Sequence, residues 1–491
     1  MSGVRWLLMI ASSSAHISDF GVPSLSATET SNNLYDLIVV GSGPAGQKAA
    51  ICAAKMRKKV AVIERKRTIG GVCVHTGTIP SKTFREAILY LSGLRQRTFY
   101  GRGYALKENI SMEDLVFRSD AVMAREIEVI KSQLRRNRVV VYEGNARFLD
   151  PHSIEVSSEE GYTLLRGTYF VIACGTRPAH SADIPIDGKR IFDSDQVHEL
   201  DELPRELIVV GAGIIGLEYA SMFAALGVKV TLLDQRSTLL DFADREVVES
   251  LCFHLRQLGT VFRLGEKVVQ VGFDEERDRV FAKLESGKTV HGGALLYAVG
   301  RAANSDQLNL GAVGLTADGR GKLVVNENFQ TAVPHVYAAG DVIGFPALAS
   351  TSMEQGRLAS CHIFGTAATI PQNLIPYGVY TIPEISMVGA TEEQLTRDKI
   401  PYEIGISRYA ELAKGQMLGD DQGFVKLIFD PASLKLLGVH IIGERAAEII
   451  HIGQAILAMG GTIDYFRDAV FNYPTLAEAY KVAALDGLNK L

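Results

Sequence analysis

One local pattern occurs twice in this chain, and it constrains the fold more than any other feature of the sequence. In the first copy, an apolar stretch at 34–40 leads into the run GSGPAG at 41–46, an alanine-rich stretch to about residue 57 and a second apolar stretch that ends at Glu64. In the second copy, the apolar stretch 207–210 leads into GAGIIG at 211–216, a helical stretch to about residue 226 and an apolar stretch that ends at Asp234. The first glycine and the acid are 23 residues apart in both copies, at 41 and 64 and at 211 and 234.

Each copy has the order strand, GxGxxG, helix, strand, acid. The glycines let the backbone turn tightly and approach a pyrophosphate at the N-terminus of the helix, and the acid accepts a hydrogen bond from a ribose hydroxyl. Two full copies with equal spacing therefore predict an α/β chain with two Rossmann-like dinucleotide-binding folds. The predicted nucleotide-binding residues are Gly41, Gly43, Gly46 and Glu64 in the first fold and Gly211, Gly213, Gly216 and Asp234 in the second.

Length and composition are those of an ordinary globular protein. The 491 residues favour about three domains, and 47% of them are hydrophobic and 22% charged. The formal net charge of −5 gives no electrostatic basis for nucleic-acid binding. No apolar run reaches the roughly 18 residues that a membrane helix needs, so no membrane partner is expected.

The cysteines and the N-terminus bear on location. The five cysteines have neither CxxC pairs nor metal-ligand spacing, which predicts a reducing, cytoplasmic location, no disulfide framework and no metal. Within residues 1–33, a six-residue apolar run is shorter than the roughly 7–15 residues of a secretory segment, and serines and threonines follow it. We expect a disordered tail or a start codon placed too early, rather than a targeting peptide.

A second motif follows the first nucleotide fold and carries the chemistry. After Gly70 and Gly71 comes the run VCVHTGTIPSK at 72–82, in which four residues separate Cys73 from Thr78. The run resembles the redox-active segment of the flavoprotein disulfide reductases, in which cysteines occupy both positions. A hydroxyl closes no disulfide and does not ionise as a thiol near its pKa does. The resemblance therefore implies a scaffold that moves a hydride through a flavin but lacks the dithiol that would pass electrons onward.

Further segments extend this resemblance over residues 34–491. The stretches 170–178 and 295–301 are similar to the two crossings between the nucleotide domains, 336–341 to the second FAD segment, and residues from about 372 to the dimerisation domain. The implied domains are FAD-binding at 34–180 and 298–371, NAD(P)-binding at 181–297, and an α+β dimerisation domain at 372–491. One non-covalent FAD per subunit is implied, in a homodimer or a higher assembly of dimers. Further implied cofactor-binding residues are Arg65, Gly70, Gly71, Val72, Cys73, Lys82, Ala146, Gly175, Gly300, Asp341 and Ala349.

The same resemblance implies a catalytic ion pair. Lys82, four residues after Thr78, matches a lysine that lies beside flavin N5 in the family and pairs with a glutamate, here Glu218. A fixed positive charge at that place would stabilise electron density on the reduced ring. A surface salt bridge worth about 0–1 kcal/mol is the alternative. The helix after residues 345–347 is expected to begin near Leu348 or Ala349, with its positive N-terminus toward the flavin.

The C-terminal segment departs from the disulfide reductases a second time. Their ending, His-Pro-Thr-x-x-Glu, has a histidine that protonates the departing thiolate, whereas this chain has Tyr473 in that position and Glu478 in the last. Tyrosine, with an ordinary pKa near 10, is a poor proton shuttle at neutral pH. Loss of the second thiol together with its acid–base partner indicates that thiol chemistry is not the function. Tyr473 and Glu478 either shape the flavin face of the partner subunit, as catalytic residues, or pack at the interface.

The rim of the second fold gives a mixed signal about the nicotinamide nucleotide. Asp234 favours the ribose diol of NAD, whereas Arg236 could pair with the 2′-phosphate of NADP or be an ordinary solvated residue. A site that accepts both nucleotides is what a transhydrogenase needs. The departures at Thr78 and Tyr473, the run FNYPT at 471–475 and the segment 444–451 resemble the soluble pyridine nucleotide transhydrogenases.

This second resemblance implies the reaction NADPH + NAD⁺ ⇌ NADP⁺ + NADH, in a ping-pong cycle that uses FAD as the carrier and NAD and NADP as substrates. Two alternatives stay open. One is an NAD(P)H:quinone or dye reductase on the same scaffold, and the other is a flavoprotein that binds nucleotides without turnover. A disulfide reductase is the least favoured, because it would require a cysteine at position 78.

Overall fold

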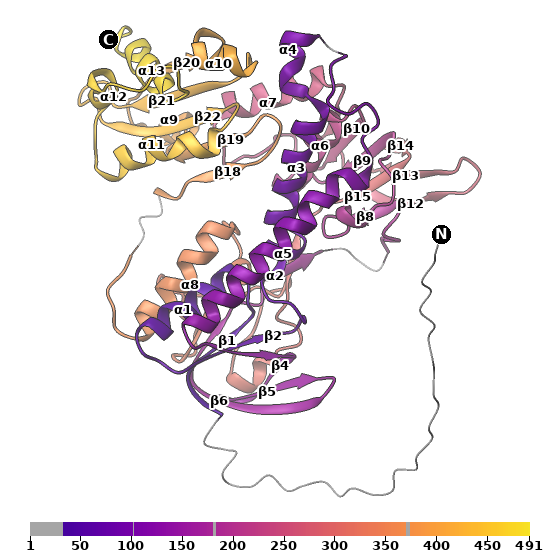
Figure 1. Cartoon of the computed structure of the whole chain (residues 1–491), viewed down its shortest axis with the longest axis vertical. Helices are drawn as coiled ribbons and strands as arrows, with labels where there is room; N and C mark the ends of the chain where they lie inside the picture. Colours follow the sequence, from indigo (N-terminus) through magenta and orange to yellow (C-terminus); the bar gives the residue numbers. More distant parts are fainter. Residues whose placement is uncertain (1–32, 102, 180–182, 370–373) are drawn as a thin grey trace, which may run out of the picture. The chain divides into compact units, whose positions relative to one another are not determined.

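The computed structural model describes residues 33–101, 103–179, 183–369 and 374–491. Its first sheet has seven strands in the order β3-β2-β1-β6-β5-β4, with β17 paired to β6 (Figure 1). β1 and β2 pair in parallel, as the first glycine-rich pattern predicts, and β3 pairs in parallel with β2. The strands are β1 Leu34–Val40, β2 Val60–Glu64, β3 Val140–Glu143, β4 Asn145–Asp150, β5 Ser153–Ser158, β6 Gly161–Ile172 and β17 Val336–Ala338.

Both faces of the first sheet are covered, which explains its apolar strands. Leu37 and Val39 on β1 are buried in one cluster with α1 (Pro44–Lys55), α5 (Met112–Arg136) and α8 (Ala349–Ile363). Ile38 points to the opposite face and packs with β4, β5 and the segment 308–323. A strand buried on both faces has a continuous apolar sequence instead of an alternating one.

The second sheet has the order β11-β10-β9-β15-β8, and its strand pairs are parallel. The strand order reverses at β9, and the second glycine-rich run follows that strand, which is where open α/β sheets bind ligands. α6 (Ile214–Ala225) covers one face. The strands are β8 Ile191–Asp193, β9 Glu206–Val210, β10 Lys229–Asp234, β11 Val261–Leu264 and β15 Ala294–Tyr297.

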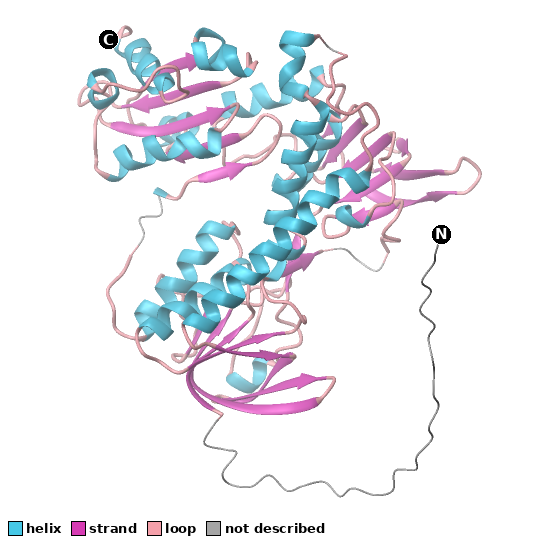
Figure 2. Ribbon diagram, viewed as in Figure 1, coloured by secondary structure: helices cyan, strands magenta, loops and turns pink. Residues whose placement is uncertain are grey.

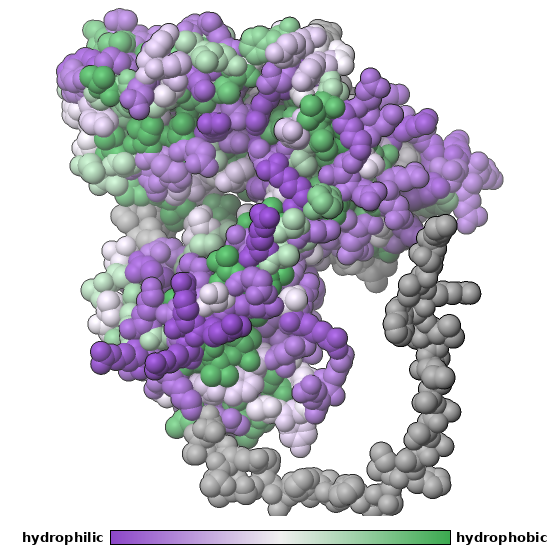
Figure 3. Space-filling view, in the orientation of Figure 1, coloured by the Kyte–Doolittle hydropathy of each residue, from purple (hydrophilic) through white to green (hydrophobic). Residues whose placement is uncertain are grey.

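Two smaller sheets accompany the second one. The antiparallel strands β12 (Val268–Asp274), β13 (Arg279–Leu284) and β14 (Thr289–Gly292) pack on its other face. β7 (Thr176–Pro178) and β16 (Arg301–Ala303) pair where the chain enters and leaves this region. Figure 3 shows hydrophilic residues gathered over the β12–β13 hairpin, whose turn at 275–278 is exposed. This hairpin is therefore a solvated edge of the fold.

The C-terminal part is built on an antiparallel sheet in the order β18-β19-β22-β21-β20. α11 (Ala446–Ala458) and α13 (Glu478–Leu488) share its buried core, in which Phe429, Phe466 and Tyr480 are large, fully buried side chains. The strands are β18 Tyr377–Val379, β19 Ile385–Gly389, β20 Glu403–Arg408, β21 Phe424–Phe429 and β22 Leu436–Ile442.

Helices occupy much of the remaining chain (Figure 2). The longest, α5, begins with a capping box in which the Ser111 hydroxyl accepts from the Asp114 N–H and the Asp114 carboxylate accepts from the Ser111 N–H. Among the described residues, no helix is both long enough and apolar enough to cross a membrane. The other helices are α2 Gly71–His75, α3 Thr78–Ser92, α4 Arg97–Tyr100, α7 Arg245–Gln257, α9 Glu392–Asp398, α10 Ala413–Leu418 and α12 Asp464–Asp468.

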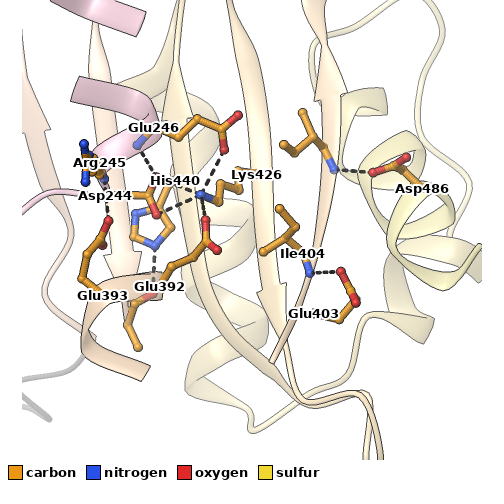
Figure 4. A network of polar contacts seen from close by, with 12 residues as sticks. Asp244, Arg245, Glu246, Glu392, Glu393, Glu403, Ile404, Lys426, His440 and Asp486 are labelled. Atoms are coloured by element: carbon orange, nitrogen blue, oxygen red, sulfur yellow. Dashed lines mark hydrogen bonds and ion pairs between the residues drawn. The ribbon is translucent and has the colours of Figure 1, made fainter. Parts of the chain in front are cut away.

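A buried lysine ties the C-terminal sheet to α7 (Figure 4). Lys426 on β21 is fully buried, and its Nζ lies 3.0 Å from Asp244 Oδ1 and 3.1 Å from Glu246 Oε2. Glu392 at the start of α9 supplies a third carboxylate to the same Nζ. Burial acts to lower the pKa of Lys426, but Glu392 and Asp244 outweigh it and hold that pKa above its usual range. Three segments distant in sequence are therefore held by one buried charge.

The predicted fold class, α/β with two dinucleotide-binding sheets and a C-terminal α+β part, is confirmed by these sheets. The predicted boundaries after residues 180 and 371 lie outside the described residues, as does the N-terminal tail except for residue 33. The boundary after 297, directly after β15, stays a prediction.

Candidate active site

The two glycine-rich runs have the same local geometry. In the first, Gly41 has a φ of +104°, and a Cβ there would overlap the carbonyl oxygen of Ala173, the residue that follows β6. A Cβ at Gly46 would overlap the carbonyl oxygen of Gly41. A Cβ at Gly43, in contrast, would meet no protein atom within 4 Å. Glycine at 43 therefore leaves open space for a ligand at the N-terminus of α1.

The second run repeats this arrangement at the end of β9. Gly211 has a φ of +99° beside the carbonyl of Ala298, and a Cβ at Gly216 would overlap the carbonyl of Gly211. Gly213, like its counterpart in the first run, borders open space, and it is the N-cap of α6. Both runs thus fit a pyrophosphate that approaches backbone N–H groups.

The acid at the end of each second strand holds the glycine-rich run in place. Glu64 Oε2 accepts from the backbone N–H of Ser42 at 3.0 Å and from its hydroxyl at 2.6 Å. Asp234 Oδ2 accepts from the backbone N–H of Ala212 at 2.7 Å. Both carboxylates are buried. Each acid therefore supports its loop in addition to the ribose contact that the sequence predicts.

One cavity of about 850 Å³ brings the two runs together. This volume lies within the roughly 300–1,000 Å³ that is common for cofactor sites. Most of the predicted site residues line the cavity: Gly41, Gly43, Glu64, Arg65, Gly71, Val72, Cys73, Lys82, Ala146, Gly175, Gly213, Glu218, Arg236, Gly300, Asp341 and Ala349. The start of α8 at Ala349, after Leu348 as N-cap, agrees with the expected helix start.

Seven predicted site residues do not line this cavity. Gly46, Gly70, Gly211, Gly216 and Asp234 lie behind its wall, where they shape or support the two loops. Tyr473 is 72% exposed, and Glu478 is the first residue of α13. That Tyr473 and Glu478 lie at the flavin of a partner subunit stays a prediction.

Cys73 lies in the cavity with a hydroxyl partner. Thr78, the first residue of α3, also lines the cavity and acts on the Cys73 thiol, and all five cysteines are free. Burial raises the pKa of the Cys73 thiol, against the opposing effects of Thr78 and of the Lys82 charge. The sulfur is therefore held mainly as a neutral thiol beside a residue with which it cannot form a disulfide.

Lys82 and Glu218 form the expected ion pair. Lys82 Nζ on α3 lies 2.7 Å from Glu218 Oε2 on α6, and the Glu218 side chain is 5% exposed. Glu218 Oε1 accepts from the backbone N–H of Tyr380 at 2.9 Å, and the Tyr380 ring centre lies 4.9 Å from Nζ. The pair is largely shielded from water, so it differs from the surface salt bridge that was the alternative interpretation.

Arg236 is held against Asp234 at the mouth of the second fold. Its Nε donates to Asp234 Oδ1 at 3.0 Å and its Nη2 to Oδ2 at 2.8 Å. Burial acts to raise the pKa of Asp234, but hydrogen bonds from Arg236 and Ala212 outweigh it and hold that pKa below its usual range. The Arg236 side chain is 44% exposed and lines the cavity, so it can also reach a ligand there.

Sequence reasoning missed several residues of the cavity. Tyr380 comes from the segment after β18, which carries no nucleotide-binding motif. Arg301 donates to the Thr176 hydroxyl at 2.8 Å and to Asp195 at 3.1 Å, and Thr176 in turn donates to Asp341 at 3.3 Å. Arg301 directly follows Gly300 in the segment 295–301, which was predicted to cross between the nucleotide domains. That position was the one sequence feature that could have indicated Arg301 as a residue of the cavity.

Family models match nearly all of the described chain. Residues 35–356 match the pyridine nucleotide-disulphide oxidoreductases, and residues 375–484 match the dimerisation domain of the same family. A soluble pyridine nucleotide transhydrogenase of Mycobacterium tuberculosis is 53% identical over 459 residues, which are 93% of this chain and 98% of the relative.

The chain belongs to the soluble pyridine nucleotide transhydrogenase family. Relatives of the same name from Photobacterium profundum and Klebsiella pneumoniae are 46% and 45% identical, each over 93% of this chain and 98% of the relative. The family is one of FAD-containing oxidoreductases, and the match to its dimerisation domain indicates that two copies of the chain assemble.

Solved structures agree with the fold. LpdA (Rv3303c) from Mycobacterium tuberculosis has a TM-score of 0.84 at 27% identity, over 91% of this chain and 99% of that one. The HOCl-induced flavoprotein disulfide reductase RclA from Escherichia coli has a TM-score of 0.81 at 26% identity, over 92% and 99%. The fold is thus similar to that of a flavoprotein disulfide reductase, although Thr78 replaces the second cysteine of the redox-active segment.

Proposed function

We propose that this chain catalyses reversible hydride transfer between NADPH and NAD⁺, with one non-covalent FAD per subunit. The observation that carries the proposal is the cavity that joins two dinucleotide loops, in which Cys73 faces Thr78 while Lys82 and Glu218 are paired. The names and high identity of the relatives support it. The site therefore has the groups that we propose for hydride transfer, but it lacks the second cysteine that a disulfide relay would need.

In the first fold, open space beside Gly43 and the N-terminus of α1 suits the FAD pyrophosphate. Glu64 and Asp341 line the same cavity and are the proposed acceptors of hydrogen bonds from the ribose and from the ribityl chain. The flavin, when bound, supplies the acceptance and return of a hydride. The protein supplies position, charge and exclusion of water.

Lys82 is the proposed electrostatic group of the site. Its charge is fixed by Glu218, which is itself held by the Tyr380 N–H, so the ammonium needs no reorganisation during the reaction. A preorganised charge in a site with little water acts strongly on developing negative charge. The N-terminus of α8, at Ala349 in the same cavity, adds a partial positive charge.

Asp234 and Arg236 are the proposed groups that let one site accept both nicotinamide nucleotides. With NAD(H), the Arg236 side chain moves aside, and the Asp234 carboxylate that it covers in this structure accepts from the ribose diol. With NADP(H), the Arg236 guanidinium turns from Asp234 to pair with the 2′-phosphate. The two nucleotides then occupy the second fold in turn, and the oxidised donor leaves before the acceptor enters.

The remaining expectations belong to the same proposal. We expect Tyr473 and Glu478 to face the flavin of the partner subunit in a homodimer or a higher assembly of dimers. We expect the FAD-binding domain to comprise residues 34–180 and 298–371, the NAD(P)-binding domain residues 181–297, and the dimerisation domain residues 372–491. We expect a cytoplasmic location, where both nucleotide pools are available, and no nucleic-acid or membrane partner.

The test is a steady-state comparison of electron acceptors on purified, FAD-loaded protein. With NADPH as donor, we expect a higher kcat/KM for NAD⁺ than for quinones, and double-reciprocal plots that are parallel. Faster transfer to quinones would indicate the reductase instead. Failure of NADPH to bleach the bound flavin would indicate a protein that binds nucleotides without turnover.

A further inference from the structure

Two thiols that are 309 residues apart in the sequence lie in contact. Cys52 on α1 and Cys361 on α8 have their sulfur atoms 3.8 Å apart. Both are free thiols, Cys361 is buried, and Cys52 is partly exposed. Both lie outside the cavity that holds the two glycine-rich runs.

The contact follows from unusually close packing of α1 and α8, which lie side by side (Figure 1). A Cβ at Gly356 would overlap the carbonyl oxygen of Ala45, and the Ser360 hydroxyl donates to the carbonyl of Ala49 at 2.8 Å. The helices therefore run in the same direction with little side-chain volume between them. Because a disulfide needs Cα atoms about 4.4–6.8 Å apart, close helix backbones are the setting it requires.

We propose that Cys52 and Cys361 are an oxidative modification site, at which a peroxide converts the two thiols into an intramolecular disulfide. The Cys52 thiolate attacks a peroxide oxygen, which yields a sulfenic acid and releases water from hydrogen peroxide. The Cys361 sulfur then attacks the Cys52 sulfur, and the hydroxyl leaves as a second water. The two sulfurs lose two electrons and two protons, and the peroxide gains both.

The surroundings of the two sulfurs determine how fast the first step proceeds. Arg357 Nη1 lies 3.7 Å from Cys361 Sγ, and Arg357 is itself paired with Glu354. Burial, and next the neighbouring Cys361, raise the pKa of Cys52 to about 11, although Arg357 and Lys55 act against this. Cys52 therefore rests as a thiol, and the reaction is expected to accelerate about tenfold per pH unit between pH 7 and 9 as its thiolate accumulates.

The site is remote from hydride transfer but connected to it. The N-termini of both helices, at Pro44 and Ala349, line the cavity, whereas Cys52 is eight residues into α1, about 12 Å along the helix. A cross-link there leaves the cavity residues in place. The cross-link joins α1 to α8, and the chain between the two cysteines forms a very long closed loop. Closing a longer loop removes more entropy from the unfolded chain, so it stabilises the folded protein more. The disulfide is therefore expected to raise the thermal midpoint of the flavin-loaded protein by several degrees.

The experiment exposes the reduced full chain to hydrogen peroxide, alkylates it and maps peptides without reduction. We expect a linked Cys52–Cys361 peptide pair and a fall in free thiols from five to three. Dithiothreitol should reverse both the link and the rise in thermal midpoint. Cys52→Ser should abolish them, while Cys252→Ser, on α7, should leave them intact.

Several results would overturn the inference, and none depends on transhydrogenase activity. Oxidation of Cys52 to sulfinic acid without a link would show that Cys361 cannot reach it. A disulfide that involves Cys73 or Cys174 would also overturn the inference. So would five free thiols that remain after exposure to peroxide at pH 9. Because peptide mapping is done on the unaltered chain, the outcome does not rest on the folding of a variant.

Discussion

Lys82 Nζ and Glu218 Oε2 lie 2.7 Å apart, and this contact joins the helix after the Cys73 segment to the helix of the second dinucleotide fold. The pair is therefore a structural link between the proposed flavin site and the proposed nicotinamide site. It also fixes a positive charge in the cavity, in which position 78, beside Cys73, carries a threonine and not a second cysteine.

Replacement of the lysine tests its electrostatic role. We expect Lys82→Met to slow bleaching of the flavin by NADPH by roughly 100-fold, since loss of one preorganised charged group has effects of about 10²–10³. Lys82→Arg, which keeps the charge, should recover part of the rate. Stopped-flow absorbance measures both. Equal rates for the Met variant and the unaltered chain would refute the electrostatic role.

Arg236 should discriminate between the two nucleotides. A charge-assisted pair with the 2′-phosphate contributes about 1.5–3 kcal/mol, so Arg236→Ala should raise the KM for NADPH by about 10- to 100-fold. The KM for NADH should change by less than about threefold, because Asp234 keeps its carboxylate for the ribose diol. Arg245→Ala, at an exposed site on α7, is the matched control. A parallel rise in both KM values would indicate that Arg236 only supports the loop.

Thr78→Cys should restore the missing dithiol. Thr78 lies close enough to act on the pKa of the Cys73 thiol, so a sulfur at 78 is expected to lie within reach of a disulfide. An anaerobic titration should then consume about twice as many reducing equivalents per flavin as the unaltered chain. We expect little disulfide reductase activity, because Tyr473 still stands in place of the proton-transferring histidine. Unchanged electron uptake would contradict the geometry of this segment.

Lys426 should be required for stability. Its removal by Lys426→Met leaves Asp244, Glu246 and Glu392 without their shared cation, and loss of one partner from a buried pair costs about 3–5 kcal/mol (Figure 4). Lys131→Met, which breaks an exposed pair with Glu128, should change stability by about 0–1 kcal/mol. Denaturant unfolding of both variants provides the comparison. Similar losses in the two would show that the buried cluster contributes little.

The parts of the site that the sequence predicts are local or belong to a known motif. The two loops follow from glycines at fixed offsets, because a tight turn and a close approach to a carbonyl each require glycine at one place, as at Gly41 and Gly46. The contact between Lys82 and Glu218 spans 136 residues and was predicted from family resemblance, not from spacing.

The parts that the sequence does not reveal depend on packing between distant segments. Lys426 has an ordinary place in an apolar strand, and only the folded chain brings its three carboxylates together. Cys52 and Cys361 appear as isolated cysteines until α1 and α8 pack against each other. The spacing of the five cysteines along the chain gives no indication that two of them touch.

The most direct measurement is an anaerobic single turnover of the purified, FAD-loaded chain. NADPH is added first, and NAD⁺ follows once the flavin absorbance has stabilised. We predict that a single equivalent of NADPH bleaches the flavin and that NAD⁺ restores it while NADH appears at the same rate. A requirement for a second equivalent of NADPH, or a flavin that stays bleached after NAD⁺, would contradict a hydride carrier that works without a sulfur couple.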